Sequence, residues 1–287
     1  MPSRNARFGG CVIIAILLFA VVVALAVGGF GWFASQWQPA PAPGQQRCVA
    51  TSGDNTTTIT LEQAHYASII AGVSVKRDLP PRAASIALAT AYQESGIRNL
   101  DYGDRDSVGL FQQRPSQGWG TEKQLMEPHY ASGRFYSALV KIRNWQNRDI
   151  NDVAQAVQVS GHPEAYRDHE TDARVLASTL TGQTPAGFTC LDRTGADGDA
   201  KRLAAALTKT FGADAKPTRD GTTLTIGADS VEHAWAYGTF AVANSAQYGT
   251  VQVVVGDQQW DTNSMTLPAW IAAEAPVKAR QVRIIVR

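Results

Sequence analysis

Apolar residues follow three different patterns along this chain. Residues 11–33 form an uninterrupted run of 23 uncharged residues rich in Val, Ile, Leu and Ala. Farther along, from Leu61 to Val73 and from Tyr130 to Ile142, apolar positions recur at helical spacing. Beyond residue 222, alternation and β-branched residues predict strands. The pattern therefore predicts a hydrophobic segment, a helical region and a smaller mixed region, in that order.

The uncharged run is long enough to cross a bilayer, which takes about 20 apolar residues in a helix. Arg4 and Arg7 precede it, and basic flanks stay in the cytoplasm, so we expect the bulk of the chain outside the cell membrane. Trp32 and Trp37 suit interfacial positions and favour an uncleaved single-pass anchor over residues 11–33. A cleaved signal peptide, which would give a secreted protein, is the alternative.

Capping signals predict where several helices begin. Thr60 and Thr121 each start a capping-box pattern, with Gln three residues later. Pro81 suits the first position of an Ala-rich helix, and Gly96 suits the position just past its end. Glu94 therefore lies in the last turn of that helix, where the negative end of the helix dipole disfavours a carboxylate. This position is expected to raise the pKa of the carboxyl group, as a general acid requires.

The residues around Glu94 resemble a known active-site signature. Glu94-Ser95, followed 15 residues later by Gly109-Leu110-Phe111-Gln112 and then by Pro115, resembles the motif of bacterial lytic transglycosylases. The intervening Gly103-Asp104-Arg105 is similar to a loop of goose-type lysozyme. Both families belong to the lysozyme-like superfamily, which cleaves the glycan strands of peptidoglycan. The resemblance covers about residues 57–182 and implies a mainly α lysozyme-like domain there.

The resemblance also implies roles for individual residues. Glu94 would be the catalytic acid, Gly109 would let the backbone approach the sugar, and Gln112 would contact the substrate. Aromatic faces stack on sugar rings, which makes Trp119 and Tyr136 candidates for the cleft. The expected substrate-binding residues are Ser95, Ser107, Gly109, Gln112, Gln158, Tyr166 and Trp119.

The third motif of the transglycosylases, usually Ala-Tyr-Asn-Ala-Gly, is altered in this chain. The run 156–160 occupies the expected place, with Val157 for the Tyr and Gln158 for the Asn. Tyr166 lies nearby in the sequence and could supply a phenol hydroxyl instead. The residue that orients Glu94 stays open at this point.

Three functions follow from the resemblance. The favoured one is a lytic transglycosylase, in which Glu94 alone cleaves the MurNAc–GlcNAc bond and leaves 1,6-anhydro ends. The second is a goose-type hydrolase, in which Asp104, or behind it Asp106 or Asp101, activates water across a gap of about 6.5–9.5 Å. Arg114 stands near where goose-type enzymes carry a further acid, which favours the first route. The third is a non-catalytic wall-binding or scaffolding protein, because a fold does not guarantee activity.

Cysteine content and charge narrow the remaining possibilities. Cys48 and Cys190 flank the helical region, and an exported compartment permits a disulfide between them; two unpaired thiols are the alternative. The net charge of +1 gives no sign of nucleic-acid binding. His162 and His169 have no further ligand at metal-site spacing, so we expect neither a metal nor a cofactor. The sequence indicates peptidoglycan as partner and identifies no protein partner.

These expectations give one fold class and five segments. The fold class is a mainly α lysozyme-like domain, preceded by one transmembrane helix and followed by a small α+β domain of unrecognised role. The expected strands of that last domain cover residues 222–226, 233–243, 249–255 and 281–286. The segments are the cytoplasmic tip and anchor (1–35), a Pro-rich linker (36–56), the lysozyme-like domain (57–182), a second linker (183–198) and the α+β domain (199–287).

Overall fold

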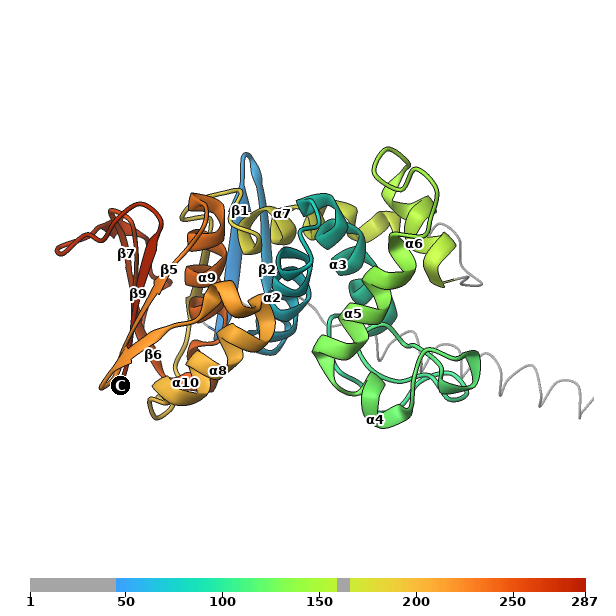
Figure 1. Cartoon of the computed structure of the whole chain (residues 1–287), viewed down its shortest axis with the longest axis horizontal. Coiled ribbons are helices and arrows are strands. Elements are labelled where there is room, and N and C mark those ends of the chain that lie inside the picture. Colours follow the sequence, from blue (N-terminus) through green and yellow to red (C-terminus); the bar gives the residue numbers. More distant parts are fainter. Residues whose placement is uncertain (1–44, 159–165) are drawn as a thin grey trace, which may run out of the picture. The chain divides into compact units, whose positions relative to one another are not determined.

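This protein contains two antiparallel sheets and a set of helices that pack on them and on one another (Figure 1). The computed structural model describes residues 45–158 and 166–287, and these belong to one compact unit. The smaller sheet has the strand order β2-β1-β3, with β1 at Arg47–Ser52, β2 at Asn55–Ile59 and β3 at Phe188–Leu191. The sheet thus joins the segment before the first described helix to a segment that follows α7.

Six helices lie between β2 and β3 along the described chain. They are α2 (Leu61–Lys76), α3 (Pro81–Ser95), α4 (Glu122–Leu125), α5 (Pro128–Leu139), α6 (Ile150–Gln158) and α7 (Glu170–Leu180), with short 3-10 turns η1 (Pro115–Gln117) and η2 (Arg167–His169). The predicted capping boxes at Thr60 and Thr121 are confirmed, because both make the reciprocal bonds with their Gln. Pro81 at the helix start and Gly96 in the left-handed conformation at its end are confirmed for α3.

The remaining residues form a second sheet with its own helices. After α8 (Ala200–Phe211) and η3 (Ala213–Ala215), the strands and helices are β4 (Thr218–Asp220), β5 (Thr223–Gly227), α9 (Val231–Ala243), α10 (Ser245–Tyr248), β6 (Thr250–Val255), β7 (Gln258–Asp261), β8 (Ile271–Ala272) and β9 (Gln281–Val286). The strand order in this sheet is β4-β5-β9-β6-β7-β8. The predicted strands that correspond to β5, β6 and β9 are confirmed.

Helix α9 lies between the two sheets (Figure 1). It contacts β6 and β9 of the larger sheet, β3 of the smaller sheet, and α2 and α7. Its sequence is apolar almost all round, and ten of its thirteen residues are buried. A helix with that composition has to be enclosed on every side. The hydrophobic core is therefore continuous from α2 through α9 to the larger sheet.

The expected fold class is wrong. The helices from α2 to α7 are not a mainly α domain followed by a separate α+β piece, because they share a sheet with residues beyond them and pack against α8 and α9. None of the described helices has the length and apolar character to cross a bilayer. The expected transmembrane segment, residues 11–33, lies outside the described residues.

Two local expectations were also wrong. The small, polar residues 52–57 predict a loop, but Asn55–Ile59 is strand β2, which pairs with β1 through a turn that contains Gly53 at φ 58°. Residues 233–243 were expected as a strand, but they belong to helix α9. Strand β2 forms by pairing with β1, and helix α9 is enclosed by two sheets; the pattern within each segment shows neither contact.

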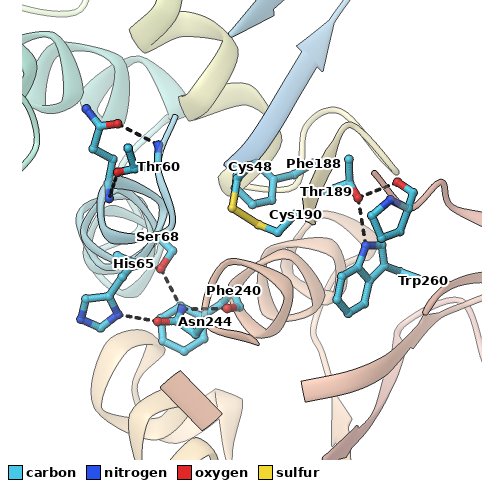
Figure 2. Close-up of a disulfide and its surroundings, with 12 residues drawn as sticks. Cys48, Thr60, His65, Ser68, Phe188, Thr189, Cys190, Phe240, Asn244 and Trp260 are labelled. Atoms are coloured by element: carbon cyan, nitrogen blue, oxygen red, sulfur yellow. Dashed lines mark hydrogen bonds between the residues drawn. A yellow bond between two sulfur atoms is a disulfide. The ribbon is translucent and has the colours of Figure 1, made fainter. Parts of the chain in front are cut away.

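The predicted disulfide is confirmed. Cys48 and Cys190 face each other across β1 and β3, and their sulfurs are bonded (Figure 2). The bond links positions 142 residues apart and both side chains are fully buried. It therefore fastens the two ends of the segment that carries Glu94.

Candidate active site

Glu94 is half-buried at the end of α3 and accepts a hydrogen bond from Tyr166. The Tyr166 hydroxyl donates to Glu94 Oε1 over 2.7 Å, and the tyrosine ring is fully buried. A phenol donor on one carboxyl oxygen fixes the rotamer of the side chain. The bond can form whether the carboxyl group is neutral or ionised, because Oε1 serves as acceptor in both states.

The local sequence explains why the carboxyl group lies at this corner. Gly96, at φ 64°, ends α3 by donating its N–H back to Tyr92. Ser95 then turns inward, and its hydroxyl donates to Leu110 O at 2.8 Å and to Ala91 O at 3.0 Å. Ser95 thus ties the helix end to the segment that contains Gly109 and Gln112. This position gives Ser95 a structural role.

The segment after Ser107 forms a tight turn beside that helix end. Val108 and Gln113 pair with each other, and Gly109 adopts φ 81° in a place where a Cβ atom would come within 2.6 Å of Leu125 O. Gln112 adopts φ 45°, which is uncommon for a residue with a side chain. Its Nε2 donates to Gly109 O at 3.2 Å and to Tyr102 O at 3.3 Å. The Gln112 amide therefore bridges the turn and ties it to the loop at Tyr102.

The three carboxylates of the loop before this turn differ in their surroundings. Asp106 accepts bonds from Arg114 Nε at 2.8 Å and from the Ser116 N–H at 2.7 Å. The Arg114 guanidinium holds the pKa of Asp106 well below its usual range. Asp104 is 78% exposed, 3.8 Å from Arg105, and Asp101 is exposed as well. Asp106 therefore braces the loop, and of the three candidate carboxylates Asp104 and Asp101 are the more exposed.

A second cluster supports the Glu94 corner from the side of Tyr166. The rings of Tyr92 and His169 stack with centroids 4.6 Å apart, and His169 Nε2 lies 3.0 Å from Gln93 Oε1. Burial lowers the pKa of His169 and raises that of Tyr92. Three consecutive residues of α3, 92 to 94, therefore each contact the segment 166–169. This cluster was not predicted from the sequence, although the spacing of Tyr166 and His169 in one helical turn is a signal for it.

The other predicted site residues divide into two groups. Gln158 donates from Nε2 to Phe111 O at 2.7 Å, and Ser107 is buried with its N–H bonded to Asp104 O, so both support the turn. Trp119 lines a surface hollow together with residues of α5, and neither Glu94 nor the Gly109–Gln112 turn belongs to that lining. The expectation that Tyr136 lines the cleft is wrong, because this side chain is fully buried and its hydroxyl donates to Ile70 O.

Within residues 45–158 and 166–287, no group of three or more His, Cys, Asp or Glu side chains could hold a metal ion. Comparison with known proteins adds no relative: no protein-family model matches the chain, and no curated protein matches it. The chemistry of the site must therefore be argued from the geometry around Glu94.

Proposed function

We propose that this protein cleaves the glycan strands of peptidoglycan between MurNAc and GlcNAc, with Glu94 as the catalytic group. The observation that supports the proposal is the hydrogen bond from Tyr166 to Glu94 at the corner formed by α3 and the Gly109–Gln112 turn. The sequence had left the orienting residue open between Gln158 and Tyr166. Gln158 is bonded to the turn, whereas Tyr166 is bonded to the carboxyl group.

In the proposed reaction Glu94 first donates its proton to the glycosidic oxygen, and the bond from that oxygen to C1 of MurNAc breaks. The carboxylate then removes the proton from the muramic 6-hydroxyl, and O6 bonds to C1 to give a 1,6-anhydro end. Glu94 returns to its protonated form, so that one carboxyl group serves as acid and as base. Tyr166 keeps Oε1 in place during both steps, because it can donate to the neutral and to the ionised group.

The surroundings of the loop carboxylates support the route without a second carboxylate. A hydrolytic route needs a general base that receives a proton from water. Asp106 is poorly suited to that role because Arg114 and Ser116 hold it in its ionised form. Asp104, with Asp101 behind it, is the better candidate for the hydrolytic alternative, and the chemical nature of the products separates the two routes.

The disulfide supports an extracytoplasmic location for this activity, since such bonds persist in oxidising compartments. Peptidoglycan lies in the same compartment. The expected partner and the expected location are therefore consistent with each other.

The test is digestion of purified sacculi by the native protein and by Glu94→Gln, with the released muropeptides measured by mass spectrometry. Loss of a general acid should reduce release about 100- to 10,000-fold. Glu122→Gln, which changes an exposed glutamate in α4, is the matched control and should release muropeptides at the native rate.

Anhydro ends would support the transglycosylase route, and reducing ends would support the hydrolytic route instead. Equal release by native protein and Glu94→Gln would remove Glu94 from the mechanism. Binding to sacculi without any release by native protein would favour the non-catalytic function.

A further inference from the structure

A hollow of about 200 Å³ lies on the surface formed by η1, the turn after it and helix α5. It is lined by Gln117, Gly118, Trp119, Arg134, Ser137, Ala138 and Lys141. Arg134 and Ala138 lie four residues apart on one face of α5, and Lys141 follows the end of that helix. Trp119 is half-buried, with part of its ring packed on the core.

Three cations converge on this hollow. Arg134 and Lys141 are exposed members of its lining. Arg77, at the end of α2, donates from Nη2 to Ser137 Oγ at 3.1 Å, so its guanidinium lies at the rim. Among the described residues, none of the three has an acidic side chain within ion-pair distance.

The charge is local to this part of the chain. Residues 128–148 contain four Lys or Arg and no Asp or Glu, so the remainder of the chain, whose total is +1, carries a net charge of −3. Helix ends explain part of this pattern, because Arg77 and Lys141 each follow a helix C-terminus, where cations are favoured. Arg134 lies inside α5, so the helix dipole does not account for a cation at this position.

The aromatic side chain gives the hollow a second kind of recognition. The structure gives the Trp119 indole N–H no acceptor within the described residues, so this donor is available to a ligand. Arg134 donates to Trp119 O at 2.9 Å and to Gly118 O at 3.0 Å, which holds the tryptophan segment against α5. A ring face and an N–H donor beside cations suit a sugar that carries an acidic group.

The geometry points to a binding site for an anionic polysaccharide at Trp119, Arg134 and Lys141, with Arg77 at its rim. The ring packs on a sugar unit, and the cations bind carboxylates on that unit and its neighbours. The lining of this hollow includes neither Glu94, nor Tyr166, nor any residue of the Gly109–Gln112 turn, so the proposed site is distinct from the proposed chemistry at Glu94. It would hold the protein on acidic wall polymer while another segment is cleaved.

The test measures binding of the full-length protein to immobilised polygalacturonate and to the same polymer after complete methyl esterification. Native protein should bind the acid form at least about tenfold more tightly at low ionic strength, and lose that preference as salt is added. Arg134→Glu with Lys141→Glu should weaken binding to the acid form about tenfold, because reversal replaces attraction with repulsion. Lys141→Glu alone, which breaks no described bond, should give a smaller loss in a protein of unchanged fold.

The matched control is Lys216→Glu with Arg219→Glu, which reverses two exposed cations elsewhere; Arg219 also donates to a backbone carbonyl. This variant should bind as the native protein does, and Trp119→Leu should weaken binding to the acid form. Equal binding of acid and ester, equal loss in the control, or preference for vesicles of anionic lipid would overturn the proposal. Glu94→Gln should bind the acid form normally, which separates this site from the proposed cleavage.

Discussion

In two regions of this protein, side-chain hydrogen bonds join distant parts of the chain, but the consequences differ. At the Glu94 corner, formed by residues 92–95, the Gly109–Gln112 turn and residues 166–169, the central carboxyl group is half-exposed. At the α2–α9 junction, formed by His65, Ser68 and Asn244, the central amide is fully buried (Figure 2). The first arrangement leaves a reactive group accessible, whereas the second removes polar groups from water.

The junction satisfies each atom of its central amide. Asn244 Nδ2 donates to Ser68 Oγ at 3.0 Å and to Phe240 O at 2.8 Å, and Oδ1 accepts from His65 Nδ1. The corner contains one residue in a sparsely populated conformation, since Gln112 is one of the six described non-glycine residues with positive φ; Ile97 and Arg105, in the loop between α3 and the turn, are two others. Such strain persists only where the surroundings impose it, and it is typical of functional sites. Substitutions at the corner should therefore change activity, and those at the junction should change stability.

The largest stability effect is expected from the disulfide, which, like the α2–α9 junction, is buried. Replacing both Cys48 and Cys190 with Ser frees a segment of 142 residues in the unfolded chain. We expect the free energy of unfolding to fall by about 4 kcal/mol, and the melting temperature by roughly 10 °C. Calorimetry of the native protein with and without reductant, beside the double variant, measures this. If the double variant and the oxidised native protein have the same melting temperature, the disulfide contributes nothing to stability.

The next effect tests the junction directly. Asn244→Leu leaves the half-buried His65 Nδ1 without its acceptor and removes the bonds to Ser68 and Phe240. The cost should be about 2–3 kcal/mol of unfolding free energy, with muropeptide release per folded molecule unchanged. Asn147→Leu makes the same change at an exposed position and should cost almost nothing. If both variants melt alike, the junction is not a source of stability.

The same two regions show what the sequence could and could not predict. Thr60, Pro81, Gly96 and Thr121 were placed correctly because a cap involves only neighbouring residues. The disulfide was predictable because few cysteines were available to pair. Strand β2 was not predicted, because it forms by pairing with β1. Helix α9 was not predicted, because its apolar residues are enclosed by two sheets that its own sequence does not show.

At the corner, sequence identified the residue types and left their partners undetermined. Glu94 and Tyr166 were both candidates, but nothing in their spacing of 72 residues gave the bond between them. Asp104 and Asp106 were ranked from a motif, whereas Arg114 decides which of them is held in place. A motif specifies which residues are present, and the three-dimensional contacts determine which of them remain accessible.

A smaller effect tests the corner. Tyr166→Phe removes the hydroxyl that donates to Glu94 Oε1 and keeps the buried ring. Hydrogen bonds to charged groups contribute about 1.5 kcal/mol or more, so we expect turnover on sacculi to fall about tenfold or somewhat more. Tyr248→Phe removes a hydroxyl that has no described hydrogen bond and is the control. Unchanged turnover with a lower melting temperature would make Tyr166 purely structural and would contradict the expectation that the corner serves activity.

The smallest effect is the pH dependence of stability, to which both regions contribute through histidines. Burial lowers the pKa of His65, of His129 and of His169 below the usual 6.5. The unfolded chain therefore binds more protons than the folded one as the pH falls below about 6.5. Stability should decrease with acidification from that point until the pH passes the lower pKa values of the folded state.

His129 allows this expectation to be assigned to one side chain. Its Nδ1 lies 2.9 Å from Glu127 Oε1 and its Nε2 lies 2.9 Å from Thr210 Oγ1, while Lys209 bonds to the same carboxylate. Hydrogen bonds from Lys209 and His129 outweigh the effect of burial and lower the pKa of Glu127 from 4.5 to about 2, so this carboxylate affects stability only in a more acidic window. His129→Gln should remove part of the loss of stability between pH 6.5 and 5 in urea titrations. It should reduce but not abolish the loss below pH 4.5, because Lys209 still bonds to Glu127 after the His129 imidazole is gone. A native protein equally stable at pH 7 and pH 5 would mean that the buried histidines accept protons without cost.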